Sequence, residues 1–259
     1  MHKSEHPAKD FLGLIAKSSH AVALTGAGIS TESGIPDYRS PETGLWEKTD
    51  MSVVSLDGFL RDPSKYYDYS RKLYPARSAA KPNPAHRLLG LLEKRGLLQG
   101  VITQNVDGLH QDGGSETVHE LHGSLRQAVC LDCNLLFPME GVMQRVIKGQ
   151  NPPYCEQCGG ILKPNAVFFG EALPQVPWKE SVVLCEKADL LIIIGSSLQV
   201  SPANILPDIA VKKGAKLIIC NLQATPFDAD ADLIVREKIG EFATLATDIL
   251  DREAKDTES

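Results

Sequence analysis

The 259-residue sequence predicts an α/β fold built on a doubly wound parallel sheet. Two observations support this class. Short apolar runs rich in β-branched residues, typical of buried strands, cover residues 20–26, 100–105, 188–197, 215–221 and 231–235. Helical patterns cover residues 84–96, 202–214 and 240–254. Because strands separated by helices form parallel βαβ units, we expect one sheet with helices on its faces.

Local signals mark the ends of these elements. The first strand, HAVALTG, runs into a glycine turn. The helix over 84–96 begins with Pro84 and ends with a basic turn and Gly96, which is typical of a capped helix. The helix over 202–214 follows the same pattern, but Pro207 lies inside it and predicts a kink or an early break. The helix over 240–254 closes the chain.

Composition limits the classes of partner. The net charge is −6, from 27 basic and 33 acidic residues, so bulk charge gives no case for nucleic acid or an anionic membrane as the main partner. The longest apolar runs are too short to span a bilayer, and the polar N-terminus lacks the apolar core of a signal peptide. We therefore expect a cytoplasmic protein, in which disulfides are rare.

Four of the six cysteines form two C-x2-C pairs, Cys130 with Cys133 and Cys155 with Cys158, separated by 21 residues. Four thiolates at this spacing suit a tetrahedral, structural zinc ion. Two disulfides are the alternative, and the expected compartment disfavours them. Cys185 and Cys220 fall on a helix and a strand and are expected to be small buried hydrophobes.

Polar or glycine clusters end four of the strands: TGAGIS, TQNVDGLH, GSSLQ and CNLQATP. In a parallel sheet they meet at one edge, where doubly wound sheets bind ligands. Turns and caps are the alternative, and they account well for Gly26, Gly195 and Ser196. They account poorly for Gln104 and Asn105, so the clusters predict a binding site.

The glycine-rich segment over 25–40 is a weak dinucleotide signal. Gly26 and Gly28 permit a tight turn and close approach to a diphosphate, but Thr31 stands where the usual fingerprint has a third glycine. A glycine turn before a helix is the alternative. Pro36 breaks any helix, so Tyr38 and Arg39 are expected on an irregular segment, where they could cover a ring and hold a phosphate. A solvated loop would explain them equally simply.

Seven motifs occur in order across nearly the whole chain: GAGIS…GIPDYRS, TQNVDGLH, ELHGS, the paired C-x2-C, PNAVFFGE, GSSLQV and NLQATP. Together they resemble the sirtuin family of NAD-dependent protein lysine deacylases, and its compact prokaryotic members most. The resemblance implies a discontinuous Rossmann-like NAD-binding domain (1–40, 84–125 and 164–259), a helical module (41–83) and a zinc-binding module (126–163). NAD and the acyl-lysine would enter the cleft between them.

The resemblance also assigns roles to residues. His122, in ELHGS, would be the general base, since imidazole titrates near neutral pH, and Asn105 would be the second catalytic residue. Asp107 would hold the carboxamide of nicotinamide. The contacts to NAD would come from Gly26, Ala27, Gly28, Ser30, Thr31, Tyr38, Arg39, Gln104, Asn105, Val106, Asp107, Gly195, Ser196, Ser197, Asn221, Leu222 and Ile239.

In the implied reaction, the acyl oxygen attacks the ribose carbon that carries nicotinamide, and His122 activates a ribose hydroxyl. The products are free lysine, nicotinamide and O-acyl-ADP-ribose, so NAD is consumed. His122 stands out by its motif, whereas His110 and His119 lie near the site in sequence and could be structural.

The stretch PNAVFFGE resembles the family's substrate segment. Val167 would meet the lysine amide, Phe169 would line the acyl tunnel, and Gly170 and Glu171 would pair with an extended peptide of loose sequence preference. A buried apolar strand followed by a turn is the alternative. The preferred partners would be acyl-lysine proteins or peptides.

The chain departs from the family pattern at two places. Tyr38 replaces the usual Phe, which puts its contact geometry in doubt. Sirtuins that prefer acidic acyl groups tend to carry Tyr and Arg three residues apart in the helical module, but here Ser70 lies three residues after Tyr67. We therefore expect uncharged acyl groups, acetyl first, to be preferred over succinyl.

Other function classes remain to be tested. An NAD-dependent protein ADP-ribosyltransferase on the same scaffold would differ only in its products. A non-catalytic zinc- and NAD-binding module is disfavoured by the intact set of His122, Asn105 and Asp107. A nicotinamide-dependent dehydrogenase would leave the cysteine pairs and VFFGE without a role.

Overall fold

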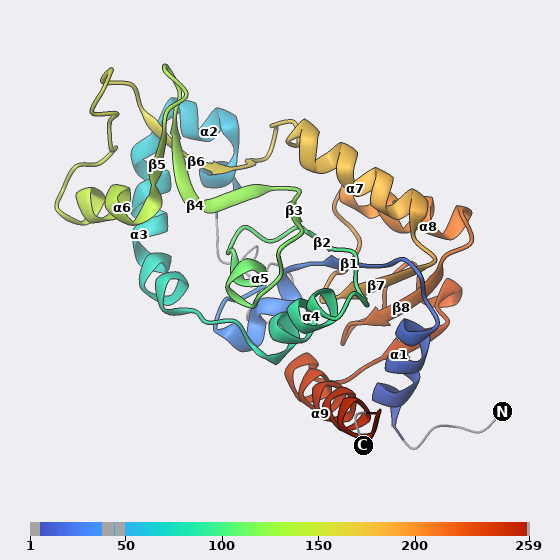
Figure 1. Cartoon of the computed structure of the whole chain (residues 1–259). Helices are drawn as coiled ribbons and strands as arrows, with labels where there is room; N and C mark the ends of the chain where they lie inside the picture. Colours follow the sequence, from blue (N-terminus) through green and yellow to red (C-terminus); the bar gives the residue numbers. More distant parts are fainter. Residues whose placement is uncertain (1–5, 38–43, 45–49, 258–259) are drawn as a thin grey trace.

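A computed structural model describes residues 6–37, 44 and 50–257. Its core is a sheet of six parallel strands (Figure 1). In spatial order these are β3 (Val118–Glu120), β2 (Val101–Thr103), β1 (Ala21–Thr25), β7 (Leu190–Ile194), β8 (Lys216–Cys220) and β9 (Leu233–Val235). The expected doubly wound sheet is confirmed.

The strand order reverses between β1 and β7. The chain starts at β1 and adds β2 and β3 on one side, then returns beside β1 with β7 and adds β8 and β9 on the other. Such a switch point leaves a crevice outside the carboxyl ends of the two strands.

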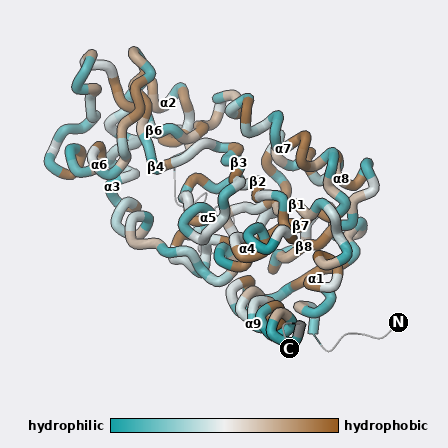
Figure 2. Tube along the Cα trace, in the orientation of Figure 1, coloured by the Kyte–Doolittle hydropathy of each residue, from teal (hydrophilic) through white to brown (hydrophobic). Residues whose placement is uncertain are grey.

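Helices cover both faces of the sheet. On one face lie α1 (Pro7–Ala16), α4 (Pro84–Lys94) and α9 (Ile239–Thr257), packed on alternate strand residues such as Ala21 and Ala23. On the other lie α7 (Gln175–Lys187) and α8 (Leu206–Lys212), packed on the intervening residues Val22 and Leu24. This alternation places the strongly apolar strands β1, β7 and β8 between two layers of helices (Figure 2).

Two helical details follow from local chemistry. Asn83 caps α4 and forms a capping box with His86, and Pro84 occupies the first turn, so the helix begins where the sequence indicates. The expected helix over 202–214 is divided into the 3₁₀ turn η4 (Ala203–Ile205) and α8, with Pro207 in the first turn of α8. Pro207 therefore starts a helix and does not kink one, since its missing N–H is harmless there.

Residues 50–79 and 123–166 build a smaller unit, seen at the upper left of Figure 1. It contains η3 (Met51–Val54), α2 (Leu56–Arg61), α3 (Pro63–Ala79) and α6 (Met139–Ile147). Its antiparallel sheet has the order β5 (Leu136–Pro138), β4 (Gly123–Cys130) and β6 (Leu162–Ala166).

The helical and cysteine-bearing parts of this unit share one hydrophobic core. Phe59 and Tyr67, from α2 and α3, pack with Met143 of α6 and with Cys130 and Leu162 of the sheet. The expected boundaries at 125/126 and 163/164 fall inside β4 and β6. The helical part and the cysteine-bearing part are therefore packed against each other, and β4 and β6 carry the chain into and out of the cysteine-bearing part.

The remaining short elements are η1 (Ala27–Ser33), α5 (Leu109–Asp112) and η5 (Asp228–Asp230). Within residues 6–37, 44 and 50–257, no helix combines the length and the apolar character needed to cross a bilayer.

Candidate active site

A cavity of about 1180 Å³ opens at the carboxyl ends of β1 and β7 and reaches the smaller unit. Most of the site residues expected from the sequence line it. They are Gly26, Ala27, Gly28, Thr31, Gln104, Asn105, Val106, His122, Val167, Phe169, Gly170, Glu171, Gly195, Ser196, Ser197, Asn221, Leu222 and Ile239. Tyr38 and Arg39 lie outside the described residues. Residues separated by over 200 positions thus meet at one edge of the sheet.

The glycine loop is shaped by contact between two strand ends. The Gly28 amide donates to the carbonyl of Gly195 at 2.8 Å, and a Cβ on Gly28 would lie 2.8 Å from the Gly195 Cα. Gly195 has a φ of 64°, a conformation that favours glycine. The turn leads into the 3₁₀ helix η1, in which the Thr31 hydroxyl donates to the Gly28 carbonyl at 3.0 Å. Glycine at position 28 therefore permits the close contact between the two strand ends, because a side chain there would collide with Gly195.

A group of polar side chains, Ser30, Asn105 and Asp107, is hydrogen-bonded next to the glycine loop. The Asn105 side-chain amide donates to the Gly26 carbonyl and to the Ser30 hydroxyl, each at 3.2 Å. Ser30 in turn donates to Asp107 at 2.7 Å. Within the described part of the chain, Ser30 and Asp107 do not line the cavity. The Ser30 hydroxyl, one of the expected contacts to NAD, is thus engaged in a hydrogen bond to Asp107.

His122 is oriented by a backbone carbonyl. Its Nδ1 lies 2.8 Å from the Gln104 carbonyl oxygen, which can only accept, so Nδ1 carries the proton and Nε2 holds the lone pair. Burial lowers the pKa of His122, although the bond to Gln104 acts in the opposite direction. A neutral, fixed imidazole on the cavity wall is suited to accept a proton.

Two other histidines are buried beside the site. The rings of His86 and His110 contact each other at a tilt of 59°, with centroids 4.9 Å apart, and His110 Nε2 lies 2.9 Å from the Thr25 hydroxyl. Burial lowers the pKa of His86 to about 4 and that of His110 to about 3, so both are neutral at pH 7. His119 instead pairs with Glu180 at 3.0 Å. Among the residues that the structure describes, none of these three lines the cavity.

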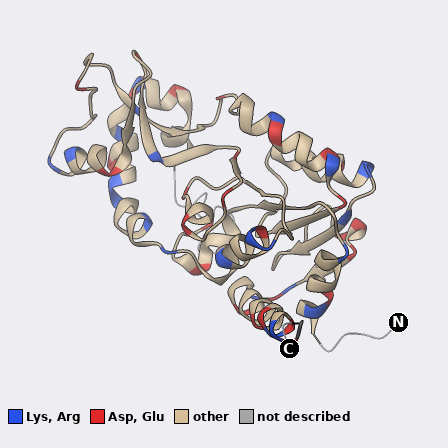
Figure 3. Ribbon diagram, viewed as in Figure 1, with Lys and Arg blue, Asp and Glu red and all other residues tan. Residues whose placement is uncertain are grey.

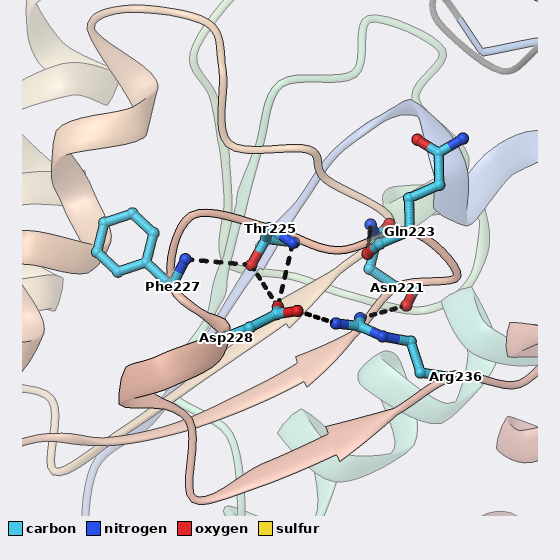
Figure 4. Close-up of polar contacts among 6 residues, drawn as sticks. All are labelled: Asn221, Gln223, Thr225, Phe227, Asp228 and Arg236. Atoms are coloured by element: carbon cyan, nitrogen blue, oxygen red, sulfur yellow. Dashed lines mark hydrogen bonds and ion pairs between the residues drawn. The ribbon is translucent and has the colours of Figure 1, made fainter.

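The loop after β8 contributes Asn221, Leu222 and Gln223 to the cavity wall. Figure 4 shows the polar contacts that hold this loop. The Asn221 side chain donates to the Gln223 carbonyl at 2.8 Å, and the Arg236 guanidinium donates to the Asn221 carbonyl and pairs with Asp228. Burial acts to raise the pKa of Asp228, but hydrogen bonds from Arg236 and Thr225 outweigh it and hold that pKa below its ordinary value. The sequence did not single out Arg236, because nothing in its neighbours signals the loop that it holds.

The segment after β6 joins the two units. The Val167 amide donates to the His122 carbonyl at 2.8 Å. The Phe169 amide and carbonyl bond at 3.0 Å to Val54 and Leu56 of the smaller unit. Only residues 162–166 form a strand, and half of the Phe169 surface is exposed. The segment is thus a buried strand followed by a turn, as the alternative expected, and the turn also forms a partly open wall of the cavity.

The four clustered cysteines lie together in the smaller unit. Their sulfur atoms are all within 4.8 Å of one another. Cys130 and Cys158 have their sulfurs 3.4 Å apart, Cys133 and Cys155 have theirs 3.7 Å apart, and all six cysteines are free thiols. A tetrahedron of Zn–S bonds of about 2.3 Å separates its sulfurs by about 3.8 Å. The group therefore fits one structural zinc ion, and the disulfide alternative fails.

Comparison with known proteins gives consistent results. The model of the Sir2 family matches residues 26–202. The chain is 46% identical to an NAD-dependent protein deacetylase of Thermodesulfovibrio yellowstonii, over 92% of each chain. It is 44% identical to one of Thermotoga maritima, over 91% of this chain and 95% of the relative.

Two solved structures extend the match. A Sir2 complex with a p53 peptide and NAD⁺ superposes with a TM-score of 0.86 and 43% identity, over 93% of this chain and 97% of the other. A Sir2 variant with a deacetylated p53 peptide and 3′-O-acetyl-ADP-ribose has a TM-score of 0.87 and 44% identity, over 91% and 95%.

Proposed function

Because the chain belongs to the Sir2 family and is an NAD-dependent protein deacetylase, we propose that the cavity at the strand edge holds both its substrates. NAD would occupy the part along η1, β2, β7 and β8, and the acyl-lysine the part beside residues 167–171. The observation that carries this assignment is the neutral His122 imidazole, fixed by Gln104 on the wall between the two parts.

The fit to NAD rests on the shape and polarity of the wall. The glycine loop presents backbone where the diphosphate would lie, and Gln104 and Asn105 follow directly from β2. Asn221 and Leu222 lie at the opposite end, where we place the adenosine. NAD supplies a ribose carbon that can release nicotinamide and accept the acyl oxygen.

Proton transfer is assigned to His122. Its Nε2 takes the proton, while the Gln104 carbonyl stabilises the cationic imidazole that results. Asn105 orients the ribose and is itself held by two hydrogen bonds, to Gly26 and Ser30. Asp107 acts through its bond to Ser30 and through its second oxygen, which accepts from the Leu109 amide at 2.9 Å. Fixed groups of this kind lower the barrier because they need no reorganisation.

Uncharged acyl groups fit the residues of α3. The Tyr67 hydroxyl is buried and donates to the Leu162 carbonyl at 2.6 Å. Ser70 is also buried, against Met143, and the nearby Arg71 pairs with Asp68 at 3.3 Å. In the described part of the chain, none of these side chains lines the cavity; the cation that α3 does place on the cavity wall is Arg77, ten residues after Tyr67. The residue three positions after Tyr67 is thus Ser70, and not the arginine that marks a preference for acidic acyl groups. Acetyl is therefore proposed as the first substrate and succinyl as a poor one.

The wider setting is also part of the proposal. The six free thiols, four of them arranged for zinc, suit a reducing compartment such as the cytoplasm. Basic and acidic residues are interspersed on α4, α7 and α9 (Figure 3), which supports protein or peptide partners over nucleic acid. The larger and smaller units correspond to NAD-binding and substrate-presenting bodies, respectively.

Mass spectrometry of one reaction tests the function. The purified protein is incubated with an acetyl-lysine peptide, with and without NAD, beside a His122→Ala variant. We expect the peptide to lose the acetyl mass only with NAD and wild-type protein, while O-acetyl-ADP-ribose appears. If the protein instead gains the mass of ADP-ribose and the peptide stays acetylated, the chain is a transferase. If neither NAD nor peptide is consumed, the proposed function is wrong.

A further inference from the structure

A buried lysine lies directly behind the peptide segment. Lys163 is on β6, and 5% of its side chain is exposed. Lysine is rarely buried, because removing its charge from water is costly unless the ammonium is paired. Burial lowers the pKa of Lys163, and the neighbouring Glu171 acts against that shift. A buried lysine of this kind needs partners that compensate for the loss of water around its ammonium.

The ammonium of Lys163 has a complete set of partners. It lies 2.8 Å from a Glu171 carboxylate oxygen and donates to the carbonyls of Ala166 at 2.8 Å and Pro164 at 3.2 Å. It also lies 4.2 Å from the centre of the Phe168 ring, a cation–π distance. An ammonium has three protons, and three acceptors receive them.

These bonds close the segment at both ends. Ala166 ends β6, and Glu171 lies five residues later. The Glu171 carboxylate also accepts from the Phe168 amide at 2.6 Å, and the Glu171 amide donates to the Phe168 carbonyl at 3.0 Å. Lys163 therefore joins the start of residues 166–171 to their end and holds the turn between them.

The turn held in this way contacts the general base and the smaller unit. Val167 donates to the His122 carbonyl, and Phe169 bonds to Val54 and Leu56. Lys163 itself does not line the cavity in the part of the chain that the structure describes. Its influence on a substrate would thus pass through the backbone of Val167 to Gly170.

We propose that Lys163 is a positioning residue for the acyl-lysine substrate: its ammonium fixes the distance between Ala166 and Glu171 and so sets the backbone against which the peptide binds. This inference rests on the proposed function, because it assigns residues 167–171 to the peptide. It assigns Lys163 a role in peptide binding and none in NAD binding.

Steady-state kinetics with an acetyl-lysine peptide and NAD, each varied separately, test the proposal. Lys163→Met should raise KM for the peptide about tenfold or more, equivalent to about 1.4 kcal/mol of binding, and leave KM for NAD within about twofold of wild type. Lys163→Arg should restore the peptide KM, because it keeps a cation. Lys148→Met is the matched control, since Lys148 is an exposed lysine of the same unit.

A double variant separates positioning from stability. Lys163→Met leaves the half-buried Glu171 carboxylate without its cation and can lower stability for that reason alone. Lys163→Met with Glu171→Gln removes both charges, so thermal unfolding should return toward wild type while the peptide KM stays above that of Glu171→Gln alone. If the peptide KM recovers together with the stability, or if both KM values rise together, Lys163 is only structural and the proposal is wrong. If the wild-type protein does not deacetylate the peptide at all, that result contradicts the proposed function and not the role of Lys163.

Discussion

The Nδ1 atom of His122 lies 2.8 Å from the carbonyl oxygen of Gln104, a residue that itself lines the cavity. The carbonyl fixes both the tautomer and the direction of the ring. It also places the base next to the strand end that carries Asn105, so one backbone segment supports both catalytic residues.

Replacing His122 with Ala should lower kcat for deacetylation by about 10²-fold or more, the usual contribution of a general base. NAD binding should change little, because the glycine loop and the Asn221 loop are untouched. Stopped-time assays of peptide deacetylation, with isothermal calorimetry for NAD, check this. If the variant keeps more than about a tenth of the wild-type kcat, His122 is not the general base.

The pH dependence of the reaction follows from the same residue. Burial places the pKa of His122 below its ordinary value of 6.5, and the base must be neutral to act. Activity should therefore rise as pH increases, with the midpoint of its acid limb below 6.5, and be level through pH 7. The profile of kcat/KM against pH gives this midpoint. A midpoint above 6.5 would contradict the assignment.

Stability should fall in acid because of His86 and His110. Their folded pKa values, about 4 and about 3, lie below the unfolded value of 6.5. Below pH 6.5 the unfolded chain binds more protons, so the free energy of unfolding should drop by about 1.4 kcal/mol per pH unit for each histidine, down to about pH 4. Urea unfolding at several pH values measures this slope, and His110→Gln should reduce it. An equal slope in wild type and variant would show that His110 does not titrate as described.

Arg236 should affect NAD and not the peptide. Arg236→Met removes the ion pair with Asp228 and the bond to the Asn221 carbonyl, both of which hold the loop at the adenosine end. Because the guanidinium is partly exposed, the expected rise in KM for NAD is modest, about three- to tenfold. Arg252→Met, at an exposed position of α9, is the control. An unchanged KM for NAD would mean that the loop is held without Arg236.

Zinc should be stoichiometric and structural. Metal analysis is expected to find about one zinc per chain, and Cys155→Ser should lose it together with much of the stability of the smaller unit. Cys185→Ala, a buried cysteine of α7, should keep the metal. Retention of zinc by the Cys155 variant would point to another set of ligands.

The sequence predicted the sheet well because its central strands are continuous apolar runs. β3 was not predicted, since its three residues Val118–Glu120 are half-buried and include His and Glu. The polar strand ends also predicted a binding site, because parallel topology brings them to one edge of the sheet. A periodic signal exists only where burial is regular.

Contacts between distant residues were beyond sequence reasoning. The bond from Ser30 to Asp107 joins residues 77 positions apart. The Lys163–Glu171 pair is close in sequence, but it depends on burial that lysine rarely shows. The shared core of the helical and cysteine-bearing parts is also long-range, as in the packing of Tyr67 against Leu162. Local sequence patterns predict helices and strands. The partners of these side chains are known only once the fold has brought the residues together.

Strand β4 begins one residue after His122 and ends at Cys130. A single extended segment of eight residues thus connects the proposed base to a metal ligand. Anyone grafting a different metal-binding domain onto this scaffold would have to preserve the length and register of that strand. A swap at the apparent module border would shift the imidazole along with the graft, so the two parts are not interchangeable units for protein engineering.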